Sequence, residues 1–449
     1  MEGDKMIKGI NKANRREKNI FVIGMSEYHR HTIKSTDEVT TLKLHNLIHN
    51  DELRGVDEMP VAELLDKARS RLDSFNGSID AIVTFLDFPA LEIMATLGRE
   101  YNCKTPRLEN LLKCNHKYWS RELQKQAAPE AIPKFSKFNP YDEDPLSQIN
   151  LDYPFWIKPV NAYRSHLGFR INGPEDFENA LPVIKEELPR ISEPFKFFLD
   201  KAELPGEIGN LDHNICLAED IISGKQCTVE GFVYERDITI YGVVDSIRDP
   251  NRSSFSRYQY PSSLPSWVQD EMTKISEKVI KQVGFRNGTF NIEFFFDRDN
   301  EKFWLLEINP RMSQSHGELF EKVDGTSNHK IMIDLALGQK PEMPYREGDF
   351  KVAGKFFLRS YEDAMVVSVP GKETVKNIEK EIPGTTIELH VDEGTQLSDL
   401  QEQDSYSYEL ASIWLGADSQ RELQRKYNMV MDKIGVKVRA KGRTKKLAT

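Results

Sequence analysis

Two acidic side chains near residue 300 have types and spacing that suit metal binding. Residues 291–297 and 303–311 have the length and apolar composition of strands, and a short polar break separates them. This pattern predicts a β-hairpin. If its turn centres on Asn300, Glu293 lies directly opposite Glu307. Directly opposed Cβ atoms are roughly 4.5–5.5 Å apart, so the two carboxylates would repel each other.

A divalent cation would turn this repulsion into binding. Asn309 lies two residues beyond Glu307 and therefore shares its face of the strand. Mg²⁺ takes oxygen ligands and keeps positions for phosphate oxygens. We therefore predict that Glu293, Glu307 and Asn309 hold Mg²⁺, or Mn²⁺ in its place, at a metal–nucleotide site. The alternative is an ordinary hairpin with both glutamates in solvent, but the apolar flanks favour covered strands, in which an unpaired carboxylate is costly.

The composition is that of a soluble globular protein and argues against several classes. Of the 449 residues, 39% are hydrophobic and 29% are charged. No window approaches a membrane span, and no apolar signal core follows the N-terminus. The net charge of −10 argues against general nucleic-acid binding. The four cysteines have no metal-ligand spacing, and without an export signal we expect reduced thiols in the cytoplasm.

Alternating strand and helix patterns predict a small parallel α/β domain near the N-terminus. Residues 19–24 and 79–86 are apolar and strand-like, and residues 61–72 between them carry helical spacing. The absence of a Gly-x-Gly-x-x-Gly turn gives no indication of dinucleotide binding. Further on, residues 246–265 are predicted to be a long loop, and a loop of that length is often functional. The basic tail, 437–449, is expected to be solvated and disordered.

These features together resemble the ATP-grasp superfamily over residues 20–435. The most specific stretch is Glu307-Ile308-Asn309-Pro310-Arg311, which is similar to the metal-binding strand of that superfamily. The resemblance implies an α/β (α+β) fold with ATP and one or two Mg²⁺ ions as cofactors, the metals held by Glu293, Glu307 and Asn309. It also implies that Arg311 steadies the transferred phosphoryl group and the acyl phosphate, in keeping with a reaction that mostly needs positioning and charge neutralisation.

The same resemblance assigns the nucleotide-binding residues. Lys117 and Lys158 would lie near the phosphates. Residues 218–224 are similar to the hinge that reads adenine through backbone groups, with Glu219 and Ile222 beside the base. Gln226 stands where the superfamily often has a glutamate that binds the ribose, and a glutamine can still donate and accept hydrogen bonds.

Two features depart from the superfamily pattern or lie outside it. Residues 161–168 replace the usual Gly/Ser-rich phosphate loop, and Arg164 or His166 in this segment would contact phosphate or substrate instead. Arg121 is expected to be exposed and structural.

The subgroup that the chain resembles most is the carboxylate–amine ligases, including L-amino acid ligases. The implied reaction activates a carboxylate as an acyl phosphate and then forms an amide with an amine. Biotin carboxylases are also similar, so an ATP-dependent carboxylase is the second hypothesis. A nucleotide-binding regulatory protein with a decayed site is the third. Small-molecule carboxylate and amine substrates are expected, with neither nucleic acid nor membrane as partner, and related ligases suggest a homodimer.

Substrate contacts are assigned to residues near the predicted phosphate site and in the long loop. Ser313 and His316 would lie at the edge of the phosphate site, and His316 is the favoured candidate. Arg248, Arg252 and Arg257 would clamp a substrate carboxylate, since a guanidinium pairs with it bidentately. The alternative for these arginines is a solvated basic loop.

The expected domain layout follows the superfamily. It comprises a disordered segment (1–18), an N-terminal α/β domain (19–114), an ATP-grasp domain (115–340) with a mobile lid at about 155–215, a C-terminal α/β extension (341–436) and the basic tail (437–449).

Overall fold

The computed structural model describes most of the chain. The described residues are 17–25, 30, 33, 42–53, 59–162, 167–204, 213–249, 254–400, 403, 406–440 and 443–446. Most of the segment predicted to be disordered lies outside them, as do Arg164 and His166 of the atypical loop and Arg252. Among the described residues, no helix combines the length and the apolar character needed to cross a bilayer. All four cysteines are free thiols.

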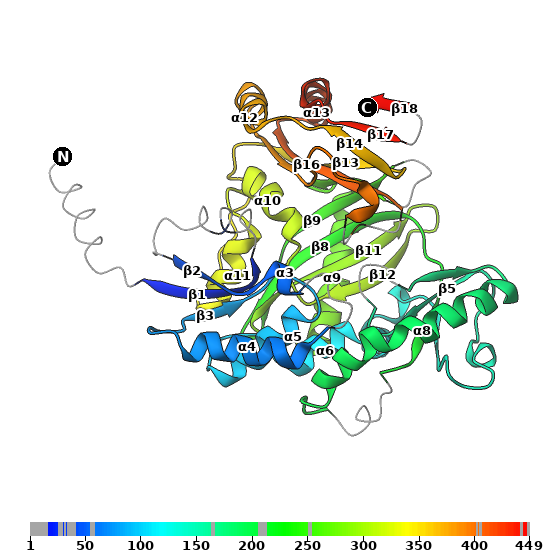
Figure 1. The fold of residues 1–449 in the computed structure, drawn as a ribbon. Helices are drawn as coiled ribbons and strands as arrows, with labels where there is room; N and C mark the ends of the chain where they lie inside the picture. The colour runs from blue at the N-terminus through cyan, green and yellow to red at the C-terminus, as the bar shows by residue number, and fades with distance from the viewer. Residues whose placement is uncertain are drawn as a thin grey trace.

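A small parallel α/β domain forms the N-terminal part, as the sequence predicted (Figure 1). Its sheet has the order β2-β1-β3, and all its pairings are parallel. The elements are β1 (Lys18–Met25), β2 (Leu42–His49), α3 (Asn50–Leu53), α4 (Val61–Asp73), β3 (Ala81–Val83), α5 (Ala90–Glu100) and α6 (Leu108–Asn115). Helix α4 buries residues at three- and four-residue spacing, as expected of an amphipathic helix. Strand β2 was not predicted, because polar residues interrupt its apolar pattern.

A four-stranded antiparallel sheet with one long helix forms a second unit, which contains the predicted lid. Its order is β4-β7-β5-β6. The elements are β4 (Phe135–Phe138), β5 (Phe155–Pro159), β6 (Phe169–Ile171), α8 (Pro174–Leu199) and β7 (Cys216–Asp220). Helix α7 (Lys117–Ala127) and the short helix η1 (Pro129–Ala131) precede them, and the short helix η2 (Leu146–Gln148) lies between β4 and β5. The sheet therefore extends beyond the predicted limits of the lid at both ends.

An eight-stranded sheet joins the central and C-terminal parts of the chain. Its order is β12-β11-β8-β9-β10-β13-β16-β15, with every pairing antiparallel. The strands are β8 (Lys225–Tyr234), β9 (Asp237–Arg248), β10 (Phe255–Tyr260), β11 (Gly288–Asp297), β12 (Lys302–Asn309), β13 (Val352–Ser360), β15 (Thr385–Leu389) and β16 (Tyr408–Ala417). The accompanying helices are α9 (Ser266–Val283), η3 (Gln314–His316), α10 (Gly317–Asp324), α11 (Asn328–Ala336), α12 (Lys372–Glu381), η4 (Leu397–Asp399) and α13 (Gln420–Ile434).

The register of the β11–β12 hairpin is the predicted one. Glu293 pairs with Glu307, and the irregularity that follows places Phe294 opposite Leu305. Strand β11 also pairs with β8, so the strand that carries Glu293 has a neighbour on both sides. The two glutamates therefore lie side by side within a wide sheet.

Two predictions about the chain were wrong. The predicted loop at 246–265 contains β10, which pairs with β9 and β13, because its three aromatic residues suit a strand in the middle of a sheet. The tail is not disordered throughout, since β17 (Lys437–Ala440) and β18 (Arg443–Lys446) extend β14 (Ala364–Ser368) into a three-stranded sheet. Val438 on the middle strand β17 is buried between the exposed basic side chains of Lys437 and Arg439.

Candidate active site

One cavity of about 540 Å³ brings together residues from all three parts described above. Its volume falls within the range of small-molecule and cofactor sites. The predicted site residues that line it are Lys117, Lys158, Glu219, Ile222, Gln226, Arg248, Glu293, Glu307, Asn309 and Arg311. Segments up to about 200 residues apart in the sequence thus meet at a single cavity.

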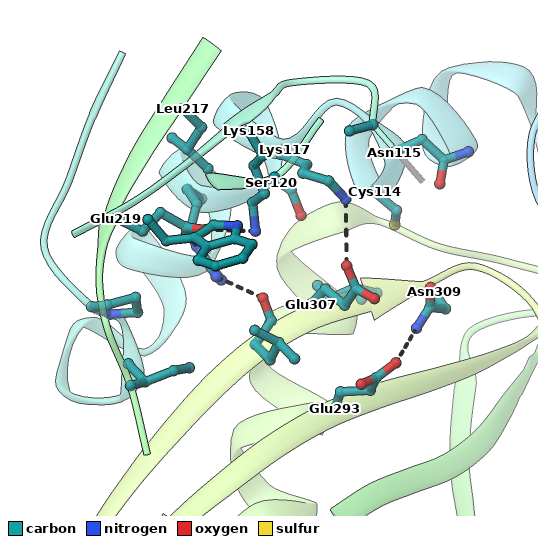
Figure 2. Close-up of a pocket in the computed structure, with 18 of the residues that line it drawn as sticks. Cys114, Asn115, Lys117, Ser120, Lys158, Leu217, Glu219, Glu293, Glu307 and Asn309 are labelled. Carbon is teal, nitrogen blue, oxygen red and sulfur yellow. Dashed lines mark hydrogen bonds and ion pairs between the residues drawn. The ribbon is translucent and has the colours of Figure 1, made fainter. Parts of the chain in front are cut away.

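Glu293 and Glu307 form the acidic side of the cavity (Figure 2). Glu293 accepts hydrogen bonds from Gln226 Nε2 (2.9 Å) and Asn309 Nδ2 (3.3 Å). Burial and the negative charge of Glu307 raise the pKa of Glu293 to about 7. Burial acts in the same direction on Glu307, but the positive charges of Lys117 and Lys158 outweigh it and lower the pKa of that carboxyl.

Lys117 faces the acidic pair from the start of α7. Its Nζ lies 3.4 Å from Glu307 Oε2, the contact marked in Figure 2. The local fold fixes this position, because the Lys117 backbone N–H donates to Val160 O (2.7 Å) and His116 caps the helix by accepting from Trp119 N–H (3.2 Å). The lysine therefore projects from a helix N-terminus, where backbone N–H groups also favour anions.

Lys158 and Glu219 belong to a buried ion-pair cluster with Arg121. Lys158 Nζ lies 2.6 Å from Glu219 Oε2, and Arg121 Nε pairs with Glu219 Oε1. Burial alone would raise the pKa of Glu219, but the two cations lower it to about 2. Burial lowers the pKa of Lys158, against the effect of Glu219.

Arg121 was predicted to be exposed, and this prediction was wrong. Its side chain is 3% exposed and also lines the cavity. Besides Glu219, it donates to the backbone carbonyls of Leu305 (3.1 Å) and Leu306 (2.6 Å) on β12. It was missed because its partners are about 100 to 185 residues away in the sequence. Arg121 thus ties α7 and β7 to the strand that carries Glu307.

Gln226 and Arg248 form the wall next to Glu293. Arg248 Nη2 donates to Gln226 Oε1 (2.8 Å), and its guanidinium lies 4.1 Å from the ring centroid of Phe255. Gln226 in turn donates to Glu293, so the glutamine connects a cation to an acid without carrying charge. Arg257 lies on β10 against the Phe356 ring and is not among the residues that line the cavity.

Arg311 is held by a residue that the sequence reasoning missed. Both carboxylate oxygens of Asp87 accept hydrogen bonds from the Arg311 guanidinium. Arg311 Nη2 lies 2.7 Å from Asp87 Oδ2, and Arg311 Nε pairs with Asp87 Oδ1. Both side chains line the cavity. One sequence signal was available, because Asp87 is the first polar residue after the predicted strand at 79–86. Its partner, however, lies 224 residues further on.

Ser313 and His316, predicted at the edge of the phosphate site, are not among the described residues that line the cavity. His316 is 2% exposed, and its Nδ1 lies 2.8 Å from Oε1 of the fully buried Glu230. The Ser313 backbone N–H donates to the same oxygen (3.1 Å). The ring of His316 packs edge-on against Tyr258. Both residues therefore anchor the segment that follows Arg311.

The donor set at the acidic side fits a hard divalent cation. It offers two carboxylates and an amide, and such a partial set leaves positions for water and phosphate oxygens, as Mg²⁺ prefers. Within the described part of the chain, no group of three or more His, Cys, Asp or Glu side chains is arranged to hold a metal. Asn309 donates its amide nitrogen to Asn291 Oδ1 (3.0 Å) and to Glu293, so ligation would require the amide to present its oxygen instead.

Residues 151–317 match a family model described as an ATP-grasp domain. A stretch of 166 residues is 26% identical to the carbamoyl phosphate synthase large chain of Clostridium acetobutylicum, which corresponds to 36% of this chain and 15% of that protein. The chain thus spans a small part of the length of this relative.

Solved structures resemble nearly the whole chain. An L-amino acid ligase from Bacillus licheniformis superposes with a TM-score of 0.70 at 16% identity, covering 94% of this chain and 99% of that one. A biotin carboxylase from Campylobacter jejuni, solved as a β,γ-ATP complex, gives a TM-score of 0.64 at 13% identity, with 96% and 93% covered. At such identities the likeness establishes the fold. Residues 151–317 thus match an ATP-grasp domain, and the chain as a whole has the fold of these solved structures.

Proposed function

We propose that this protein is an ATP-dependent ligase that joins a carboxylate to an amine and releases ADP and phosphate. One observation carries the proposal: a single cavity holds the opposed pair Glu293 and Glu307 together with Lys117, Lys158 and Arg311. This arrangement suits a metal-bound triphosphate, because phosphoryl transfer depends on positioning and on neutralising charge.

The proposed roles follow the positions of the side chains. Lys117 and Lys158 bind phosphate oxygens, and Glu293, Glu307 and Asn309 hold Mg²⁺, which neutralises charge on the phosphates when it is bound. Ile222 and the backbone near Glu219 contact adenine, while the Glu219 carboxylate is occupied by Lys158 and Arg121.

The proposed reaction has two steps. An oxygen of the substrate carboxylate attacks the γ-phosphorus, the bond to the β–γ bridging oxygen breaks, and ADP leaves. The amine nitrogen then attacks the acyl carbon, phosphate leaves with the electron pair of the C–O bond, and the amine loses a proton. Arg311 balances the charge of the acyl phosphate, which must be shielded from water between the steps.

A biotin carboxylase-like reaction is the second candidate. The observation that favours it is the likeness to the Campylobacter jejuni biotin carboxylase over 96% of this chain. Both candidates use Mg-ATP and differ in what accepts the activated carboxyl group. The homodimer and the cytoplasmic location remain predictions.

The decisive assay measures ADP and phosphate release with Mg-ATP against a matrix of amino acids and small carboxylic acids. Release that needs one carboxylate and one amine, and that disappears in Glu307→Ala, supports the ligase. Release that needs bicarbonate and biotin supports the carboxylase. Binding of ATP without release under any condition would contradict both and favour a regulatory protein.

A further inference from the structure

We propose that one end of the cavity, between the N-terminal domain and α8, binds the amine substrate through hydrogen-bond acceptors alone. This inference rests on the proposed ligase function and names the place of its second substrate. The residues that form this end, here called the amine end, are Asp87, Phe88, Asn115, Asn161 and Phe195, and all five line the cavity.

Ring packing and one hydrogen bond define the amine end. Phe88, next to Asp87 in the chain, packs against Phe195 of α8 with ring centroids 5.5 Å apart. Asn161 donates its Nδ2 to the carbonyl of Ile191 (3.2 Å), one helical turn before Phe195. Two phenylalanines and the polar side chains therefore surround the same end of the cavity.

Both asparagines have their amide nitrogens engaged with protein acceptors. Asn115 Nδ2 donates to Glu92 Oε1 at 2.6 Å, and Asn161 Nδ2 donates to Ile191 O. In both residues, which line the cavity, the side-chain oxygen is therefore left as an acceptor. Asn161 is only 5% exposed, and its Oδ1 is buried without a hydrogen-bond partner among the described residues. A buried oxygen without a donor is costly, so a ligand N–H would relieve it.

Asp87 adds a negatively charged acceptor. Its two oxygens bind the Arg311 guanidinium, but a carboxylate offers roughly four lone-pair sites, so each oxygen can accept again. The side chain is 33% exposed. The polar groups at the amine end are therefore acceptors, and they suit an ammonium or amine group, which brings only N–H donors as a cation.

The neighbouring residues define the substrate class further. Arg311, bound to Asp87, places the proposed acyl-phosphate position beside the amine end. The rings of Phe88 and Phe195 favour an apolar substituent on the amine, and aromatic rings also attract cations. The expected second substrate is thus a primary amine with an apolar side chain, such as an apolar amino acid.

Asn161→Leu is the sharpest test, because leucine has a similar shape and removes the acceptor. The amine substrate used is whichever of the twenty common amino acids gives the fastest release in the assay above. Hydroxylamine serves as the comparison, because this small nucleophile is largely neutral at pH 7.5 and traps the acyl phosphate directly. We expect the KM for the amino acid to rise about tenfold or more, as for loss of a hydrogen bond to a charged group. The KM for ATP and hydroxamate formation should change less than about twofold.

Ser192→Ala is the matched control. Ser192 is fully buried on α8, next to Ile191, and its hydroxyl donates to Asn214 Oδ1 (2.7 Å) without lining the cavity. The Ser192→Ala variant loses one partly buried hydrogen bond of the same helix and should leave the amine KM unchanged. An unchanged amine KM in Asn161→Leu, or equal losses with the amino acid and hydroxylamine, would overturn the proposal.

Binding without turnover separates this proposal from the ligase function. Benzylamine and its neutral counterpart benzyl alcohol are titrated into the full-length wild-type protein and Asn161→Leu, with Mg-ADP present. Benzylamine should bind the variant about tenfold more weakly, and the alcohol should show no such difference. If no carboxylate supports ADP release, the ligase proposal fails. The titration still tests whether the amine end binds an amine through Asn161. Equal benzylamine affinity in the two proteins, or no binding to either, overturns it.

Discussion

Two carboxylates on the same sheet, Glu230 and Glu293, have opposite surroundings. Glu230 on β8 is fully buried and accepts hydrogen bonds from Ser313 N–H, His316 and the Tyr241 hydroxyl. Glu293 on the adjacent strand β11 lies opposite another carboxylate, and its donors are two amides. Burial and the charge of Glu307 raise the pKa of Glu293 to about 7.

The difference separates structural from ligand-binding acids. A carboxylate with a full set of protein donors needs nothing further, so it stabilises the fold. A carboxylate that faces another across a strand pair destabilises the fold until a cation binds, so it indicates a ligand. Loss of the first kind should therefore lower stability, and loss of the second kind should lower activity.

The largest expected effect is on activity, from Glu307→Gln. Removing one of the opposed charges should lower the rate of phosphate release by roughly a hundredfold or more, comparable to losing a preorganised electrostatic group. The thermal midpoint should change little, because the substitution also removes the repulsion with Glu293. Glu301→Gln, in the exposed turn of the same hairpin, is the control and should keep wild-type activity. Activity above half the wild-type value in Glu307→Gln would contradict a metal role.

The next effect is on stability, from Glu230→Ala. The substitution leaves three donors, one of them the buried His316, without their acceptor, at a cost of about 3 kcal/mol or more. We expect a clear drop in the thermal midpoint, measured at a fixed scan rate because unfolding of a chain this long need not be reversible. Glu230→Gln keeps the shape and one acceptor oxygen and should lose less. Equal stability of Glu230→Ala and wild type would show that the network contributes little.

A smaller effect is expected from ligand binding. Mg-ADP at about one hundred times its Kd should stabilise the native state by about 2.7 kcal/mol and so raise the thermal midpoint. This rise in thermal midpoint on adding Mg-ADP should persist in Glu230→Gln and become much smaller in Glu307→Gln. In the wild type it should become smaller when EDTA removes Mg²⁺. If the gain is the same in both variants, the comparison between the two acids fails.

Glu92 in the N-terminal domain extends the comparison to a third carboxylate. It is fully buried, Asn115 donates to one of its oxygens, and the other is without a partner among the described residues. Burial raises its pKa to about 7, against the opposing effect of that hydrogen bond. The folded state therefore holds a proton that the unfolded state releases between about pH 4.5 and 7. The stability contributed by this proton is complete below that window and is lost as the pH rises through it.

The smallest expected effect is therefore a pH-dependent stabilisation by Glu92→Gln. The variant should exceed wild type in thermal midpoint at pH 8 by more than it does at pH 5, because glutamine carries no charge to bury. Thermal scans of both proteins at the two pH values measure this difference. A constant difference, or a larger one at pH 5, would mean that Glu92 is ionised in the folded protein.

Local patterns in the sequence predicted the hairpin well. Glu293 and Glu307 flank a short turn, so counting residues from the turn was enough to place them opposite each other. Strand β5, which carries Lys158, likewise coincides with a short apolar run in the sequence. The loop at 246–265 and the basic tail were misjudged, because their strands pair with β9, β13 and β14, partners that no local pattern indicates.

The sequence by itself determined the contacts that depend on spacing along one or two strands, and from them the acidic pair and the metal–nucleotide interpretation. Only the tertiary structure decided that Asp87 holds Arg311, 224 residues away, that Arg121 binds Glu219, and that His316 belongs to Glu230 instead of the cavity. It also decided which atoms of Asn115 and Asn161 are engaged with protein acceptors and which are left as acceptors. The physical reason is that hydrogen-bond partners of buried polar groups are chosen by packing between distant segments, whereas strand register is set by the turn next to it.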